Sequence, residues 1–372
     1  MSVEFHRFAV AVSAETEDCV RVSFEVPAAL RDRFRHVPGQ HLVLRREIEG
    51  QDIRRSYSIW NRPGDERPSV AIKRIPGGLF STWATTALHD GDTLEVMEPL
   101  GEFRYQPVAS STGNYVALAA GSGITPVLSI LTSVLEVETS SRVMLVYGNR
   151  AAATIMFLEE LDALKCRFPD RFVLVHVLSR EPHEVPLFEG HIDPEKLRRL
   201  ADTLIDVASV SAWFVCGPLD MVQGVRDTLQ ELGVADANVH FELFFDQRIE
   251  RVALAGQPAE GTLRLTLTLD GRTSVVAIDP NGPSLLDSAR SVRPETPFGC
   301  KGAMCATCKA QILDGTVRMA KNYALSDAEL AAGYVLTCQA HAVDVDVTLT
   351  FDAGLGSRAG APPEVTVNKV RD

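Results

Sequence analysis

Four cysteines in the last quarter of the chain have a spacing that could hold a metal cluster. Cys300, Cys305 and Cys308 form a C-x4-C-x2-C motif, and Cys338 follows after 29 further residues. Four thiolates at this spacing bind a 2Fe–2S cluster, with three ligands from one loop and one from a distant segment. A zinc site or buried structural cysteines are the alternatives, but zinc sites usually have two C-x2-C-like hooks, and this chain has one. We interpret the motif as an iron–sulfur site.

Two short segments in the first third could bind a phosphorylated aromatic cofactor. Residues 54–58, Arg-Arg-Ser-Tyr-Ser, combine cations for phosphate, a ring that can stack and a hydroxyl group. Residues 76–82, Pro-Gly-Gly-Leu-Phe-Ser-Thr, place two glycines at the start of a helical pattern, where free N–H groups favour a pyrophosphate. Each segment alone has a plain structural interpretation, as an edge strand and as a capped turn.

A glycine-rich turn in the middle third could bind a nucleotide. Gly121, Gly123 and Pro126 follow the apolar run 115–120 and precede the helical pattern 127–135. The pattern differs from the dinucleotide fingerprint G-x-G-x-x-G, and a lone glycine pair is a weak signal. The position between a strand and a helix strengthens it, because the N-terminus of the helix then faces the phosphates.

Three blocks of different periodicity must position these residues, and they predict a multidomain protein. Residues 1–108 contain short β-runs separated by Gly and Pro, which indicates an antiparallel β-barrel. Residues 109–248 alternate strands and helices, which indicates an α/β domain with a parallel sheet. Residues 262–356 contain a hairpin, a helix, the cysteine loop and a returning strand, an α+β order. We predict a linker at 249–261 and a flexible tail at 357–372.

Composition limits the class of protein. Of the 372 residues, 45% are apolar and 23% are charged, which is typical of globular domains, and the net charge of −12 argues against nucleic acid or an anionic membrane as a partner. We find no apolar run of about 20 residues and no signal-peptide core. Outside the motif, Cys19, Cys166 and Cys216 are scattered and odd in number, as expected of reduced thiols in a cytoplasmic protein.

Together and in this order, the first two blocks resemble the ferredoxin–NADP reductase superfamily, and the third resembles a plant-type ferredoxin with the β-grasp fold. The flavin motif of that superfamily, R-x-Y-S followed by G-G-x-x-S, matches the first-third segments. The resemblance implies an FAD site in which Arg55 binds the pyrophosphate, Tyr57 stacks on the isoalloxazine and Ser58 lies near flavin N5. The implied phosphate-binding residues are Gly77, Gly78, Leu79, Phe80, Ser81 and Thr82.

The same resemblance implies a nicotinamide nucleotide site, with Thr125 beside the nicotinamide and Phe244 shielding the flavin. Cys216, at the end of a strand, is also open to interpretation as a small core thiol. We do not expect it to act as a nucleophile, because hydride transfer needs none. The implied nucleotide-site residues are Gly121, Gly123, Thr125, Pro126, Cys216, Gly217, Pro218, Met221 and Phe244. Tyr57, Ser58, Thr125 and Cys216 are the candidate catalytic residues.

The choice of nucleotide depends on the segment after the third strand of the α/β block. Ser179 and Arg180 match the pair with which NADP-specific members bind the 2′-phosphate, and Arg150 could add a second cation. Glu181 follows immediately and would suit the free ribose diol of NADH. We expect NADPH, with NADH as the alternative.

The resemblance further implies one electron path, from NADPH to FAD to the 2Fe–2S cluster. The order of the modules is similar to that of reductases that serve multicomponent oxygenases, so we expect the oxygenase component to be the protein partner. A reductase for another hydroxylase, or a redox-sensing protein with a regulatory cluster, are the alternatives.

Overall fold

The computed structural model describes residues 4–65, 67–244, 262–352 and 364–367, and the chain divides into two compact units. One unit spans Phe5–Asp246, and the other contains Gln247–Asp372 together with Met1–Glu4. The predicted linker, 249–261, lies outside the described residues. No helix in the described ranges is long and apolar enough to cross a membrane.

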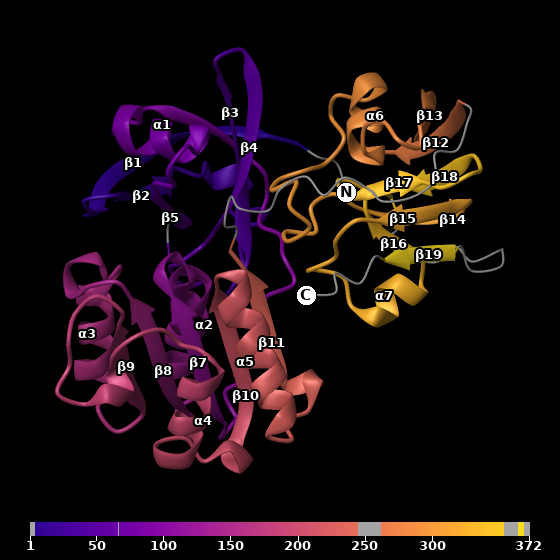
Figure 1. Cartoon of the computed structure of the whole chain (residues 1–372). Helices are drawn as coiled ribbons and strands as arrows, with labels where there is room; N and C mark the ends of the chain where they lie inside the picture. The colour runs from indigo at the N-terminus through magenta and orange to yellow at the C-terminus, as the bar shows by residue number, and fades with distance from the viewer. Residues whose placement is uncertain (1–3, 66, 245–261, 353–363, 368–372) are drawn as a thin grey trace. The chain divides into compact units, whose positions relative to one another are not determined.

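The N-terminal half of the larger unit is a six-stranded antiparallel sheet with the order β4-β3-β6-β1-β2-β5. Figure 1 labels β1, β2, β3, β4 and β5 of this sheet. An isolated bridge between Ile59 and Val70 links the chain after β4 to β5, the other edge strand. Alternating side chains such as Phe8, Val22 and Leu44 fill the interior. The elements are β1 (His6–Thr16), β2 (Cys19–Phe24), β3 (His41–Ile48), β4 (Gln51–Ser58), β5 (Ser69–Lys73), α1 (Leu79–Ala87) and β6 (Thr93–Val96).

The second half of this unit is a five-stranded parallel sheet with the order β11-β10-β7-β8-β9. Helix α2 packs on β7, β8 and β10, and α5 packs on β10 and β11. The chain order reverses between β7 and β10, and ligands of such sheets bind at the carboxyl ends of the strands at this point. The elements are β7 (Asn114–Ala120), α2 (Ile124–Val137), β8 (Arg142–Asn149), α3 (Leu158–Arg167), β9 (Phe172–Leu178), α4 (Pro194–Thr203), β10 (Val210–Gly217), α5 (Leu219–Glu231) and β11 (Val239–Leu243).

The smaller unit contains a five-stranded mixed sheet, β13-β12-β18-β14-β16, and a three-stranded sheet, β17-β15-β19. Helix α6 packs on β12 and β13, and its N-cap Ser284 accepts a hydrogen bond from the N–H of Asp287. The elements are β12 (Leu263–Leu269), β13 (Arg272–Ile278), α6 (Leu285–Val292), β14 (Lys309–Asp314), β15 (Thr316–Met319), α7 (Asp327–Ala331), β16 (Tyr334–Leu336), β17 (Ala340–Ala342), β18 (Val347–Thr350) and β19 (Glu364–Val367).

The structure differs from the predicted tail at one segment. Residues Glu364–Val367 form strand β19, which pairs in parallel with β15. The sequence Glu-Val-Thr-Val alternates polar and apolar residues, as a strand requires, but two prolines precede it and made the whole segment resemble a tail.

Candidate functional site

Strand β4 separates its two arginines into different roles. Arg54 is buried, 2.9 Å from Asp52 Oδ2 through its Nη2, and its guanidinium lies over the ring of Phe5. The side chain of Arg55 is exposed. Because side chains alternate along a strand, only Arg55 of this pair is available for a phosphate.

Tyr57 and the start of α1 lie next to each other in the barrel. The ring centroids of Tyr57 and Phe80 are 5.7 Å apart, and burial raises the pKa of the Tyr57 phenol, so that it stays neutral. The first helical hydrogen bond of α1 runs from the N–H of Thr82 to the carbonyl of Gly78. The N–H groups of the first helical turn therefore remain available to an anion.

The hydroxyl of Ser81 is used differently from the sequence expectation. It accepts a hydrogen bond from the N–H of Ile75 at 3.1 Å and donates one to the carbonyl of Gly78 at 3.3 Å. Ser81 is 4% exposed, whereas Thr82 is exposed. Ser81 thus braces the glycine turn, and Thr82 has the accessible hydroxyl.

The glycine turn after β7 lies directly against the end of β10. A Cβ atom on Gly123 would lie 2.2 Å from the carbonyl oxygen of Cys216, so only glycine fits there. Thr125 is 2% exposed and its hydroxyl donates to the carbonyl of Ser122 at 2.9 Å, which holds the first turn of α2. The Met221 side chain covers Gly217, with Cε and Sδ each 3.1 Å from the position of a Cβ atom there.

Cys216 is fully buried at the end of β10, and its register partner on the neighbouring strand is Glu242. Burial, and then the nearby charge of Glu242, raise the pKa of the Cys216 thiol well above its usual value. The N–H of Phe244 donates to the carbonyl of Gly217 at 3.0 Å, which holds the chain after β11 beside the same strand end. The thiol of Cys216 is therefore neutral and unsuited to nucleophilic attack.

Glu242 joins the two halves of the larger unit. Its Oε2 accepts a hydrogen bond from the hydroxyl of Ser58 at 3.2 Å, and its Oε1 is 3.9 Å from His41 Nδ1. His41 lies opposite Ser58 in the β3–β4 ladder, and a Cβ atom on Gly101 would lie 2.8 Å from His41 Nδ1. Neither Glu242 nor His41 is among the site residues predicted from the sequence, because their contact joins distant segments of the chain.

Backbone hydrogen bonds join the loops after β8 and β9, which carry the residues predicted to select the nucleotide. The N–H of Arg180 donates to the carbonyl of Arg150 at 2.8 Å, and both side chains are exposed. The N–H of Ser179 donates to the carbonyl of Asn149 at 3.0 Å. Glu181 Oε1 accepts a hydrogen bond from the N–H of Ala152 at 3.0 Å, so this carboxylate already has a backbone partner.

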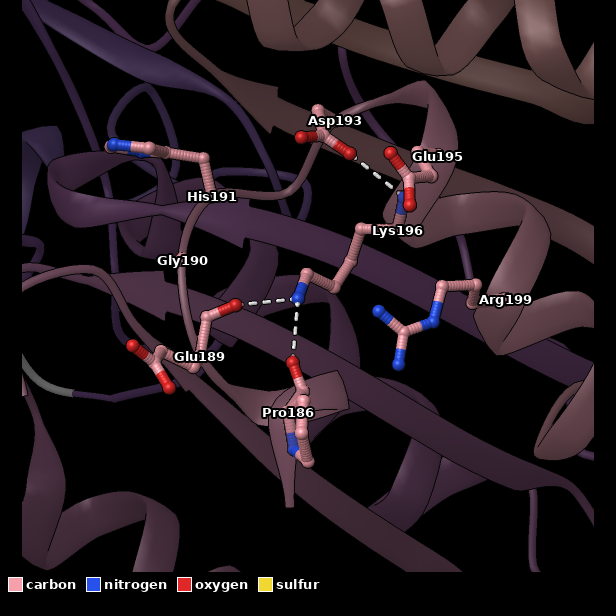
Figure 2. Close-up of a pocket in the computed structure, with 8 residues that line it drawn as sticks. All are labelled: Pro186, Glu189, Gly190, His191, Asp193, Glu195, Lys196 and Arg199. Atoms are coloured by element: carbon pink, nitrogen blue, oxygen red, sulfur yellow. Dashed lines mark hydrogen bonds between the residues drawn. The ribbon is translucent and has the colours of Figure 1, made fainter. Parts of the chain in front are cut away.

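A cavity of about 350 Å³ follows this region, between the loop after β9 and α4 (Figure 2). Lys196, which is 7% exposed, lies on it, and its Nζ donates to the carbonyls of Glu189 at 2.5 Å and Pro186 at 3.3 Å. A second cavity, of about 210 Å³, lies between the segment after β4 and helices α2 and α3. None of the predicted cofactor residues lines either cavity.

In the smaller unit, the four motif cysteines come from the loop before β14 and the turn between β16 and β17. The backbone N–H of Cys300 donates to Cys305 Sγ at 3.4 Å, which brings two of the motif residues together. The hydroxyl of Thr337 donates to the carbonyl of Cys308 at 2.9 Å and joins the two segments.

The loop around these sulfurs supplies donors and a rare backbone conformation. Lys301, Ala303 and Ala306 have φ between +51° and +65°, the left-handed region that side chains other than glycine seldom adopt. The N–H of Gly302 donates to Cys300 Sγ at 3.2 Å, and the Thr307 hydroxyl donates to Cys305 Sγ at 3.1 Å. Strained loops of this kind persist at ligand sites, and donors to sulfur stabilise thiolates.

The donor set fits a two-iron cluster. Within the described residues, no group of three His, Cys, Asp or Glu side chains is arranged to hold a single metal ion. A 2Fe–2S cluster would instead take four cysteine thiolates as one set. Cys300, Cys305, Cys308 and Cys338 would hold it.

Comparison with known proteins identifies each block. Residues 10–105 match the oxidoreductase FAD-binding domain, residues 117–227 the oxidoreductase NAD-binding domain, and residues 267–343 the 2Fe-2S iron-sulfur cluster binding domain. The chain is 41% identical over 350 residues to one component of the 1,2-phenylacetyl-CoA epoxidase of Escherichia coli K12, over 94% of this chain and 98% of that protein. The chain belongs to the ferredoxin reductase-type flavoproteins with a 2Fe–2S domain.

Other members of this family have the same extent. The ferredoxin reductase component of the 3-ketosteroid-9-alpha-monooxygenase of Rhodococcus rhodochrous is 32% identical, over 92% of this chain and 95% of that protein. The fold of phthalate dioxygenase reductase matches with a TM-score of 0.55 at 22% identity, over 93% of this chain and 98% of that one. The predicted fold class is confirmed: an FAD domain, a parallel-sheet nucleotide domain and a ferredoxin domain.

Membership in the family also confirms the predicted activity at the level of class. The protein is an oxidoreductase of the kind that serves as the reductase component of an oxygenase system. Its relatives are reductase components of multicomponent oxygenase systems, which pass electrons to an oxygenase component. This chain has domains for FAD, for a nicotinamide nucleotide and for a 2Fe–2S cluster.

Proposed function

We propose that this chain carries electrons from NADPH through FAD and the 2Fe–2S cluster to the diiron oxygenase component of a phenylacetyl-CoA epoxidase, in aerobic phenylacetate degradation. The observation that carries this proposal is the 41% identity to a component of such an epoxidase over nearly the full length of both chains. The 3-ketosteroid monooxygenase reductase covers a similar extent at only 32%.

In this proposal, the residues of the chain bind the cofactors, orient them and shield them from water. Bound FAD supplies the chemistry that accepts two electrons as hydride and passes them on singly. Arg55, exposed beside the buried Arg54, binds its pyrophosphate, and Tyr57, packed on Phe80, offers a neutral ring for stacking. The N–H groups at the start of α1 and the hydroxyl of Thr82 contact phosphate.

In the nucleotide domain, glycines allow neighbouring backbone segments to pack closely. Gly123 packs against the carbonyl of Cys216, and Gly217 packs against the side chain of Met221. This close packing orients the turn after β7 and the end of β10, where the nicotinamide binds in this proposal. The hydroxyl of Ser58 holds a proton on the Glu242 side of the flavin site, where the pair also fixes the β4 end against β11. Cys216 contributes a small, neutral side chain to the site, which suits hydride transfer because that reaction needs no nucleophile.

We further propose NADPH as the physiological donor. Glu181, the residue that would suit a free ribose diol, is bonded to the N–H of Ala152. The exposed guanidinium groups of Arg150 and Arg180 come from loops joined by a backbone hydrogen bond. Two guanidinium groups favour a phosphate over a diol.

Arg180→Gln is expected to lower kcat/KM for NADPH by about 10- to 100-fold, because hydrogen bonds to charged groups contribute about 1.5–3 kcal/mol. The value for NADH should stay the same. Steady-state reduction of ferricyanide with each nucleotide measures both. Arg199→Gln, on α4 beside the cavity of Figure 2, is the matched control and should change neither. Equal losses with NADPH and NADH would contradict the assignment.

Reconstitution tests the partner. The reductase, NADPH, phenylacetyl-CoA and the oxygenase components of the epoxidase should together form the epoxide, and the oxygenase of a 3-ketosteroid monooxygenase should give far less turnover. Absence of epoxide with a fully loaded reductase would overturn the proposal. Negligible reduction of cytochrome c by NADPH would instead favour the redox-sensing alternative.

A further inference from the structure

A lysine lies inside the cysteine loop, and it forms an ion pair with a carboxylate on a helix. Lys301 directly follows Cys300 in the left-handed conformation, with φ of 54°. Its Nζ is 2.7 Å from Oδ1 of Asp287, in the first turn of α6, and 5.1 Å from the ring centroid of Phe298. Lysine and carboxylate are each about half exposed, at 41% and 45% of their side chains.

The structure fixes both partners of this ion pair. The hydroxyl of Ser284, the N-cap of α6, donates to Asp287 Oδ2 at 3.2 Å. The side-chain amide of Gln339, next to Cys338, donates to the carbonyl of Lys301 at 3.1 Å. The pair is therefore anchored to the helix on one side and to both cysteine segments on the other. An exposed pair of long side chains without such anchors would exchange its partners freely.

Charge at this place acts on the reduction potential of a cluster. A cluster with four thiolates is an anion and becomes more negative on reduction, so its potential depends on net charge and solvent exposure. A cation beside it favours the reduced form, and a carboxylate disfavours it. Lys301 alone would raise the potential, and Asp287 offsets that charge.

We propose that the Asp287–Lys301 ion pair sets the reduction potential of the cluster, with Asp287 as the positioning residue that neutralises the loop lysine. The inference rests on the proposed assignment of the four cysteines to the cluster. The cluster that the four cysteines would hold supplies one-electron transfer between the flavin and the oxygenase, so no further reactant would be needed. A neutral pair keeps the potential low enough for the cluster to pass that electron on.

A charge cycle on the full-length, FAD- and cluster-loaded protein tests this. The proteins are the wild type, Asp287→Asn, Lys301→Gln and the double variant. Anaerobic redox titration with mediators, followed by EPR of the reduced cluster, measures each potential. Asp287→Asn should raise the potential and Lys301→Gln should lower it, each by about tenfold in the reduction equilibrium, which is about 59 mV for one electron.

The double variant should return close to the wild-type potential, because it restores a neutral pair. Both single shifts should shrink at high salt, since the pair is half exposed. Asp346→Asn, which removes a carboxylate paired with Arg264 at 2.9 Å elsewhere in this unit, is the matched control and should leave the potential unchanged. If Asp287→Asn fails to retain the cluster, Lys301→Gln alone still tests the predicted decrease.

Three outcomes would overturn the inference: unmoved potentials, shifts of the same sign in both single variants, or a double variant that does not return. A role only in bracing the loop would lower cluster content without opposite shifts. If the wild-type protein gives no 2Fe–2S signal on reduction, the proposed cluster assignment itself is wrong. A cluster that is present but whose potential does not depend on the ion pair would overturn only this inference.

Discussion

Cys338→Ser is expected to leave a reductase that still takes hydride from NADPH but delivers almost no electrons to the proposed oxygenase partner. Cys338 is the one motif cysteine that comes from the segment before β17, so its loss opens the cluster site on that side. Changes to residues that only support a metal ligand lower metal affinity about 10- to 100-fold, and loss of a ligand costs more. We expect oxygenase-coupled turnover to fall about 100-fold or more, while anaerobic reduction of FAD by NADPH keeps its rate.

Iron and sulfide content, EPR of the reduced protein and stopped-flow absorbance of the flavin measure this result. Cys166→Ser is the control, because Cys166 is an exposed cysteine on α3 outside the motif. It should retain both cluster and turnover. A Cys338→Ser protein that keeps a full cluster signal and wild-type turnover would contradict the four-cysteine assignment.

Gly123→Ala is expected to slow reduction of FAD by NADPH about 100-fold. The added Cβ would lie 2.2 Å from the carbonyl oxygen of Cys216, and two backbone segments would have to move apart. Displacement of about 1 Å at a hydride-transfer site costs roughly this factor. Stopped-flow absorbance measures the rate, and dithionite, which needs no nucleotide site, should still reduce the flavin fully.

The matched control for this prediction is Gly224→Ala. Gly224 lies in α5, and its Cβ would meet only side-chain atoms of Pro194, at 3.0 and 3.1 Å. The ring of Pro194 can shift by a few tenths of an ångström, and alanine favours a helix, so the rate should stay close to that of the wild type. Similar slowing in both variants would point to a general loss of stability.

The parts that could be predicted from the sequence are those that local patterns determine. The cysteine spacing, the glycines before α1 and α2, and the change from alternating strands to strand–helix units each lie within a short window. Asp193 and Pro194 at the start of α4 are such a local signal, because capping chemistry acts over three residues. Such signals are sufficient for the fold class and for the family.

Contacts between segments that are far apart in the chain could not be predicted from the sequence. Ser58 and Glu242 are 184 positions apart and meet only because β4 and β11 belong to one unit. The hydrogen bond that occupies Glu181 depends on how the loops after β8 and β9 meet, so the carboxylate appeared to argue for NADH. The pairing of Asp287 with Lys301 is similarly a product of the tertiary fold. None of these pairings leaves a periodic signal.

Within the smaller unit, the elements between the cysteines show the same limit. Short strands such as β15 and β17 carry three or four residues each, too few for an alternation to stand out. Helix α7 is five residues long, and its capping box, Ser326 with Glu329, was the signal that could have located it.

Anaerobic titration of the complete protein with NADPH, followed by visible absorbance and EPR, tests the central claim most directly. We expect the flavin bands to bleach first. Once enough NADPH has been added to reduce both cofactors, the EPR signal of one reduced 2Fe–2S cluster per chain should appear. The same reduction with NADH should require higher concentrations of the nucleotide. A protein that contains FAD and iron but whose cluster stays oxidised under excess NADPH would contradict the electron path.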